Sequence, residues 1–189
     1  MVEEARLEDV GSGLAPVTQG WFVVNARDAA WLANDVFGTK CVFEADRPVV
    51  RRRPDLPVQR FEQVGINLHV LEPGQPSGMY HAESNQEDFL VLAGECLVIV
   101  DGVDRSLAAW DFVHCPPGTE HVFVGAGDGP CVILMTGRRN PDRQIVYPMS
   151  ESARRYGASV ETETNSAAEA YAPFPHWQPA AGPELRQLR

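Results

Sequence analysis

The amino-acid sequence predicts an all-β protein, built as a barrel or sandwich of short strands. Between residues 61 and 137 the chain consists of short runs rich in β-branched and aromatic residues, each bounded by turn residues. No helical periodicity interrupts these runs, a pattern that is typical of barrels and sandwiches. The length of 189 residues and the hydrophobic share of 44% allow one well-filled core.

The first 60 residues are expected to form an N-terminal arm and extension that pack on the barrel. Residues 1–20 carry acidic and turn-forming residues without periodicity, which predicts a loosely held arm. The stretch 21–38 begins with a strand-like run, after which Asn25 or Asp28 is expected to cap a short helical turn. Residues 44–60 hold three prolines and five arginines, which indicates an extended connection with a solvated or acid-paired surface; a clamp for an anionic ligand is the alternative.

Residues 61–137 are expected to form the barrel itself. Ile66, Leu68 and Val70 alternate with polar residues, which is the period of a half-buried strand. The dipeptide Asp101-Gly102 lies between two apolar runs and is a strong hairpin signal. The further predicted strands are 79–83, 87–93, 95–100, 103–108, 111–115, 120–124 and 131–136.

Residues 138–189 are expected to form a C-terminal helical extension and tail. Residues 150–160 and 165–174 each begin with Ser or Asn, which are favoured helix N-caps, and continue with helix-forming residues. In the tail that follows, Trp177 is the candidate for docking on the rest of the protein. Two short appended helices are therefore expected, and no second domain.

The overall charge and the terminal sequence narrow the classes of function. A net charge of -10 and a pI of about 4.9 disfavour binding to nucleic acid or to an anionic membrane. No apolar stretch approaches the ~20 residues of a membrane span, and the first residues do not have the pattern of a secretion signal. We therefore expect a cytoplasmic protein whose partner is a small molecule. The four scattered cysteines are expected to be reduced core thiols.

Three ionisable residues, His81, Glu83 and Glu87, lie just before an apolar run. His81 and Glu83 are two residues apart and therefore project from one face of a strand. Glu87 shares its face with Phe89 and Val91, at the end of a strand that is apolar on both sides. A buried carboxylate there needs compensation by a metal, an ion-pair partner or water.

The stretch 115–124, CPPGTEHVFV, supplies a second imidazole. Pro116 to Gly118 force a tight turn, and His121 follows at the head of an apolar strand. If this strand folds back, His121 reaches the same point as His81. Imidazoles and carboxylates together are good ligands for a divalent transition metal such as Fe, Zn, Mn or Ni.

The stretch around His81 resembles the first motif of the cupin superfamily. That motif reads G-x5-H-x-H-x3/4-E-x6-G. This chain has His81, then Glu83 where the second His is usual, then Glu87 and Gly94.

The stretch around His121 resembles the second cupin motif, which reads G-x5-P-x-G-x2-H-x3-N. Pro116, Gly118 and His121 match this motif, whereas Trp110 and Gly125 stand in the positions of its leading Gly and its final Asn. The resemblance covers residues 61–137 and matches the motif spacing well.

The resemblance implies a double-stranded β-helix, the cupin or jelly-roll barrel, with a site inside it near one mouth. It implies that His81, Glu87 and His121 are metal ligands. Glu83 departs from the family pattern: it either joins the metal as a fourth ligand or stays outside as a catalytic general acid/base. In the second case, two His and one carboxylate match the facial triad that favours non-haem Fe(II).

The resemblance also implies a metal-dependent protein that acts on a small molecule, and oxygenase and isomerase chemistry are both open. A non-catalytic metal-binding cupin that binds or senses a small molecule is the alternative. A homodimer is expected, because the apolar, Arg-flanked N-terminal segment is suited to add a strand to a partner's sheet edge.

Three other reactive side chains are interpreted as structural. His69 lies on the alternating strand and is expected to be hydrogen-bonded in the core or at the rim. His114 has no motif position. Cys115, beside the Pro-Pro turn, is expected to be a buried and inert thiol.

Overall fold

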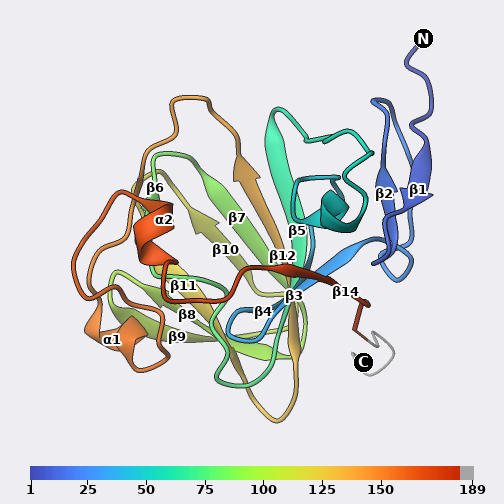
Figure 1. Ribbon diagram of the computed structural model, residues 1–189. Coiled ribbons are helices and arrows are strands. Elements are labelled where there is room, and N and C mark those ends of the chain that lie inside the picture. Colours follow the sequence, from blue (N-terminus) through green and yellow to red (C-terminus); the bar gives the residue numbers. More distant parts are fainter. Residues whose placement is uncertain (184–189) are drawn as a thin grey trace.

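The computed structural model describes residues 1–183, which are mostly strands (Figure 1). The elements up to residue 93 are β1 (Leu7–Asp9), β2 (Leu14–Pro16), β3 (Trp31–Asn34), β4 (Gly38–Cys41), the 3-10 helix η1 (Val49–Arg52), β5 (Val64–Leu71), β6 (Ala82–Glu83) and β7 (Glu87–Ala93). They are followed by β8 (Glu95–Val100), β9 (Val103–Ala108), β10 (Phe112–Cys115), β11 (His121–Ala126), β12 (Cys131–Arg138), β13 (Ile145–Val146), α1 (Glu151–Arg154), α2 (Ala167–Ala170) and β14 (Gln178–Ala180). The predicted all-β class is confirmed.

Two antiparallel sheets build the barrel. The larger sheet has the order β10-β7-β12-β5-β4-β3-β14, and the smaller one has the order β11-β8-β9. Apolar side chains of both sheets meet between them and form the core, which contains Leu71, Phe89, Val91, Cys96, Val98, Cys115, Phe123, Cys131 and Ile133. This arrangement is the double-stranded β-helix that the resemblance to cupins implies. The larger sheet also takes in β3, β4 and β14, from outside residues 61–137.

Strand β7 explains why the polar cluster and the core share one face. Side chains two residues apart on a strand point the same way, and Phe89 and Val91 are both buried in the core. Glu87 has the same parity and begins the strand, where it pairs with Cys115 of β10 and Gly137 of β12. The barrel interior therefore passes directly from an apolar core to a carboxylate.

The predicted Asp101-Gly102 hairpin is confirmed. Val100 pairs with Val103, so two residues connect β8 to β9. The φ angles of Asp101 and Gly102 are 48° and 76°, the positive values that a type I′ turn requires. Asp and Gly adopt such angles at low steric cost, which explains the strength of the sequence signal.

The first 60 residues differ from their prediction. Residues 1–20 form the β1-β2 hairpin, with the side chain of Val10 buried, rather than a loose arm. The helical turn expected after Asn25 is confined to residues 26–28, where the N–H groups of Asp28 and Ala29 donate to the Asn25 carbonyl at 2.9 and 3.1 Å. It does not continue to Trp31. The Asn25 side chain accepts a hydrogen bond from the N–H of Arg27 at 3.0 Å and closes only a turn, and Trp31 then begins strand β3 with 0% exposure. Burial of this apolar run between β4 and β14 outweighs the local capping signal.

The C-terminal segment contains the two expected helices in shortened form. The Ser150 and Ser166 side chains accept hydrogen bonds from main-chain N–H groups three residues on, but α1 and α2 have only four residues each. Figure 1 shows these helices and the β1-β2 hairpin on opposite sides of the molecule. Within residues 1–183, no helix is both long enough and apolar enough to cross a membrane.

Candidate metal centre

Three side chains from three segments converge inside the barrel. His81 precedes β6, Glu87 begins β7 and His121 begins β11. One potential ligand atom from each side chain lies within 4.8 Å of the other two. The structure thus brings together three of the four residues that the sequence nominates as metal ligands.

Main-chain hydrogen bonds hold the two imidazoles side by side. The N–H of His81 donates to the carbonyl of His121 at 3.1 Å, and the N–H of His121 donates to the carbonyl of His81 at 2.8 Å. The turn before His121 is fixed by Gly118, whose φ is 86° and whose N–H donates to the carbonyl of Glu83 at 2.7 Å. The imidazole ring centroids consequently lie 5.0 Å apart.

Both imidazoles present the same nitrogen to the cluster. Nδ1 of His81 lies 2.8 Å from the carbonyl oxygen of Met79, and Nδ1 of His121 lies 3.0 Å from that of Thr119. A carbonyl oxygen only accepts, so both Nδ1 atoms carry the proton and a neutral ring keeps a lone pair on Nε2. Burial, followed by the neighbouring His121, lowers the pKa of His81 to about 4, and burial also lowers the pKa of His121. Both rings are therefore neutral near pH 7, which is the form that binds metals.

The Glu87 carboxylate completes the cluster. Its Oε2 lies 3.6 Å from Nε2 of His121 and 3.9 Å from Nε2 of His81. Burial, followed by the nearby Glu83, raises the pKa of Glu87 to about 8, although Arg143 opposes the shift. A bare carboxyl group would hold a proton at this position, whereas a bound cation keeps it ionised.

The three donors fit a divalent transition metal. Bonds of about 2.0–2.2 Å from one ion to nitrogen and oxygen place the ligand atoms roughly 3–3.5 Å apart. The observed separations of 3.6 and 3.9 Å are slightly longer than this and too long for hydrogen bonds, so the donors do not satisfy one another. Two imidazoles and a carboxylate suit Fe, Zn, Mn and Ni alike.

Glu83, the fourth nominated residue, lies beside the cluster and is paired elsewhere. Its Oε1 is 4.0 Å from Nε2 of His81 but 2.5 Å from Nη1 of Arg143. Burial raises the pKa of Glu83, and the Arg143 guanidinium opposes this shift. The compensation for this carboxylate is therefore an ion pair, one of the three possibilities that the residues alone leave open.

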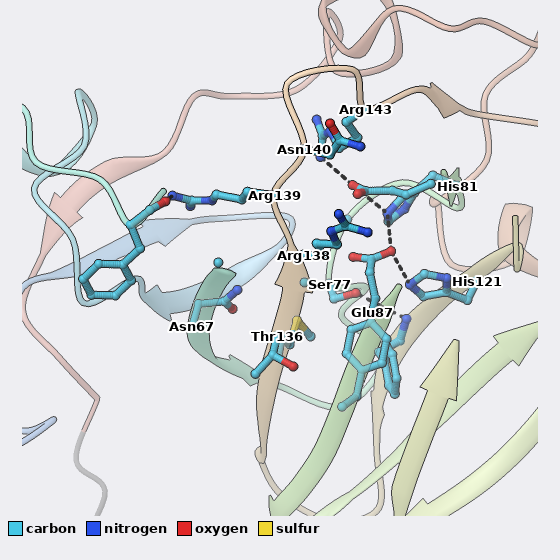
Figure 2. Close-up of a pocket in the computed structure, with 18 of the residues that line it drawn as sticks. Asn67, Ser77, His81, Glu87, His121, Thr136, Arg138, Arg139, Asn140 and Arg143 are labelled. Carbon is cyan, nitrogen blue, oxygen red and sulfur yellow. Dashed lines mark hydrogen bonds and ion pairs between the residues drawn. The ribbon is translucent and has the colours of Figure 1, made fainter. Parts of the chain in front are cut away.

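The cluster borders a cavity of about 640 Å³. Figure 2 shows the side chains of His81, Glu87 and His121 turned toward one another at its wall. Phe89 and Phe123 supply apolar lining next to His121, with the Phe89 ring centroid 5.1 Å from that of His121. The cavity has room for a small molecule next to the three donor atoms.

A family model described as a cupin domain matches residues 67–137, the part of the chain that contains both motif stretches. Residues 67–137 of the protein therefore form a cupin domain. The comparison with curated proteins gave no match.

Solved cupin structures resemble this cupin in fold. A sugar phosphate isomerase of the cupin superfamily from Silicibacter pomeroyi shares 21% identity, covers 65% of this chain and 79% of its own, and has a TM-score of 0.50. A proposed sugar phosphate isomerase from Acidithiobacillus ferrooxidans shares 25% identity over 58% of this chain and 64% of its own, with a TM-score of 0.43. A DMSP lyase from Ruegeria pomeroyi shares 22% identity over 45% of this chain and 43% of its own, with a TM-score of 0.39. The cupin therefore spans less than two thirds of the last two proteins.

Sequence reasoning missed most of the basic residues that line the cavity of this cupin. Arg138, Arg139 and Arg143 lie at the end of β12 and in the segment after it. The sequence signal was the basic stretch 136–143, TGRRNPDR, which directly follows the last predicted barrel strand. Such a stretch reads as a solvated surface until the fold shows that it borders the barrel mouth.

The arginine-rich run 44–60 contributes only Arg60 to the lining of this cavity. Arg53 instead pairs with Glu8 at 3.5 Å and with Asp55 at 2.9 Å. This part of the run is therefore the acid-paired surface that the sequence favours over an anion clamp.

The structural interpretation of three further side chains is confirmed. His69 is buried, and its Nε2 lies 2.8 Å from the carbonyl oxygen of Phe37. His114 is exposed, with Nδ1 2.6 Å from Oδ1 of Asp88. Cys115 is a buried free thiol, and burial raises its pKa to about 11, which makes it unreactive near neutral pH.

Proposed function

We propose that this cupin is a metal-dependent enzyme that acts on a small molecule. The convergence of His81, Glu87 and His121 beside a cavity of about 640 Å³ carries the proposal. Three protein ligands leave coordination positions open, as catalytic sites require and closed structural sites do not. A divalent transition metal bound there supplies Lewis-acid or oxygen-activating chemistry.

Glu83 is the proposed catalytic acid/base. Its carboxylate lines the cavity and lies 4.0 Å from Nε2 of His81, close to where a substrate next to the cluster would be. Arg143 fixes its orientation through a 2.5 Å contact. Burial raises the pKa of Glu83, which brings the carboxyl group closer to the range in which proton exchange is efficient at neutral pH.

Isomerase-type and oxygenase-type reactions make different demands on this site. An isomerase that moves a proton between neighbouring carbons needs a base, whereas an oxygenase with a His-His-carboxylate triad consumes O₂. The second carboxylate beside the triad favours the isomerase type. Measurement of oxygen uptake during a substrate screen distinguishes the two, because only the oxygenase consumes oxygen.

A non-catalytic module that binds or senses a small molecule is the second candidate. The Glu83–Arg143 ion pair favours it, because a carboxylate stabilised by a guanidinium is a weaker base. In that case the metal would organise the pocket, and Glu83 would have a structural role.

The ligand assignment is tested with His81→Ala and His121→Ala. Each substitution removes one of three donors, so we expect bound metal to fall from about one equivalent to background. Elemental analysis of protein purified without chelators or nickel resin measures this. His114→Ala, which removes an exposed imidazole, is the matched control and should retain the metal. Unchanged metal content in both cluster variants would contradict the assignment.

Glu83→Gln separates the roles proposed for that residue. An acid/base role predicts retained metal and turnover reduced by about 10²–10⁴-fold, measured on the substrate that the screen identifies. Loss of the metal would make Glu83 a ligand instead. Glu95→Gln, at an exposed position of β8, is the control for loss of a carboxylate and should change neither property. Undiminished turnover with metal retained would remove Glu83 from the mechanism.

A further inference from the structure

The cavity contains a concentration of positive charge, although the chain as a whole has a net charge of -10. Four arginines line it, namely Arg60, Arg138, Arg139 and Arg143. Glutamates also line it, so its preference for a ligand depends on which charges are already paired. A cation left unpaired in a concave site attracts a ligand of opposite charge.

Two of the four arginines are occupied by carboxylates. Arg139 donates to both oxygens of Glu44, at 2.9 and 2.7 Å, and to the carbonyl of Phe61 at 2.5 Å. The Glu44 side chain is only 2% exposed, so this bidentate pair belongs to the wall of the barrel. Arg143 is bound to Glu83. Neither guanidinium is free for a ligand without breaking a partly buried pair.

Arg60 lies at the rim. Its Nε is 3.9 Å from Glu44, and its side chain is 62% exposed. This cation is therefore already paired, loosely, with the buried Glu44 carboxylate.

Arg138 is exposed, as Arg60 is, and differs from the other three in its pairing. In the described part of the chain, no carboxylate lies within 4.0 Å of its guanidinium and its side chain makes no hydrogen bond. Its main chain is nevertheless well fixed, because its N–H donates to the carbonyl of Gln86 at 3.1 Å and its carbonyl accepts from Nδ2 of Asn85 at 3.0 Å. Figure 2 shows the Arg138 side chain among the residues that line the cavity. The main chain of Arg138 is thus fixed, whereas its guanidinium has no partner among residues 1–183.

A neutral group in the same cavity also lacks a partner. Oδ1 of Asn67, on β5, is buried and makes no hydrogen bond to residues 1–183. A buried polar atom without a partner is costly and rare for that reason. The atom is closed to water-sized groups in this structure, so a ligand hydroxyl would bond to it once the Asn67 side chain turns toward the cavity.

We propose that Arg138 binds the anionic group of the substrate, and that the substrate is a small, hydroxylated carboxylate or phosphate. This inference rests on the proposed function, because it assigns the other end of the same molecule to the metal centre. A guanidinium recognises either anion through two parallel hydrogen bonds. A divalent ion and the Arg138 guanidinium carry positive charge, and the Glu87 carboxylate offsets only part of it. An anionic substrate would neutralise the remaining positive charge.

The test compares wild-type protein with Arg138→Gln and with Arg105→Gln. Arg105 is an exposed residue of β9 that does not line the cavity, so it controls for the loss of one charge. Inorganic phosphate and glycolate are the two probes, titrated by calorimetry at constant ionic strength into metal-free and zinc-loaded protein. Since hydrogen bonds to charged groups contribute about 1.5–3 kcal/mol, Arg138→Gln should weaken binding roughly 10–100-fold. Arg105→Gln should bind as the wild type does.

Inorganic phosphate represents a phosphate group and glycolate represents a carboxylate. The probe that binds with the higher affinity identifies the anionic group that the cavity favours. Equal affinity in wild type and Arg138→Gln overturns the inference, and so does a wild type that binds neither probe. The circular dichroism of Arg138→Gln checks that this exposed substitution leaves the fold intact.

Zinc uptake by the same preparations tests the proposed function separately. If anion binding depends on Arg138 but the protein takes up no zinc, only the metal proposal is wrong. If the protein takes up zinc but binds the anion equally well without Arg138, only this inference is wrong.

Discussion

His69 and His121 are buried to a similar degree, yet they present opposite nitrogens to their surroundings. Burial is the main cause that lowers the pKa of each ring, to about 3 for His69. In His69 it is Nε2 that contacts a main-chain carbonyl, that of Phe37, at 2.8 Å. In His121 it is Nδ1 that contacts a carbonyl, at 3.0 Å, and Nε2 is left facing Glu87 at 3.6 Å.

The comparison teaches that burial and a lowered pKa do not by themselves mark a metal ligand. Both histidines have these properties, and only His121 has a free Nε2 that converges with other donors. The region around His69 is instead closed by Lys40, its partner on β4, and by the Trp177 ring, whose centroid lies 5.6 Å from the imidazole. We therefore expect substitutions in the His69 region to change stability and substitutions in the His121 region to change metal binding.

The largest expected effect in the His69 region comes from His69→Ala. It leaves a cavity and removes the partner of the Phe37 carbonyl, so the free energy of unfolding should fall by about 2–4 kcal/mol. Denaturant unfolding measures the loss, and elemental analysis should show unchanged metal content. His114→Ala, at an exposed position, should change the free energy of unfolding by less than about 0.5 kcal/mol. Loss of metal from folded His69→Ala protein would break the comparison.

A smaller effect is the dependence of stability on pH. Burial, followed by the charge of Lys40, lowers the pKa of folded His69 to about 3, whereas the unfolded chain has a His pKa of about 6.5. As the pH falls, the unfolded state takes up the proton first. The stability associated with neutral His69 is therefore complete above about pH 6.5 and is lost between about pH 6.5 and 3, at up to roughly 1.4 kcal/mol per pH unit.

Urea unfolding of wild type and His69→Phe across this pH window measures that slope. His81 and His121 remain in both proteins, so their own contributions of the same sign cancel in the difference. Lys40 and Trp177 are the groups that face His69. Burial lowers the pKa of Lys40 to about 8, so Lys40 keeps nearly all of its charge below pH 6.5. Identical slopes in the two proteins would show that His69 does not titrate as the structure indicates.

The smallest expected effect concerns Trp177, the tail residue that the sequence nominates for docking. It packs on the barrel, with Nζ of Lys40 4.0 Å from its ring centroid. Trp177→Phe should lower the free energy of unfolding by about 0.5–2 kcal/mol, since Phe attracts a cation less strongly than Trp. Thermal unfolding measures this, and the metal content should not change. A Trp177→Phe protein that lost its metal would show that the two regions are coupled.

Much of the barrel was predictable because its signals are local. The alternation around Leu68 and the Asp101-Gly102 turn depend only on neighbouring residues, and the structure confirms both. The convergence of His81, Glu87 and His121 was predictable from motif spacing together with the resemblance to cupins, because a given barrel topology places those positions at one end. The homodimer stays a prediction.

Apart from the β1-β2 hairpin, which is local, the main features that sequence reasoning missed are contacts between distant segments. Strand β3 was predicted as a helical turn, because the capping signal of Asn25 is local and the pairing with β4 and β14 is not. The partner of Glu83 comes from Arg143, 60 residues further along the chain. No periodicity or spacing rule encodes such a pair.

The sequence by itself determined the strands of residues 61–137, their tight hairpin turn and the set of side chains able to bind a metal, because these depend on side-chain type and on the two-residue period of a strand. The tertiary structure decided the state of each of those side chains. It gave Glu83 an arginine, gave His69 a carbonyl and left the Arg138 side chain without a partner among residues 1–183. The physical reason is that a buried charge or lone pair is stabilised only by the groups that folding brings to it, and those groups lie elsewhere in the chain.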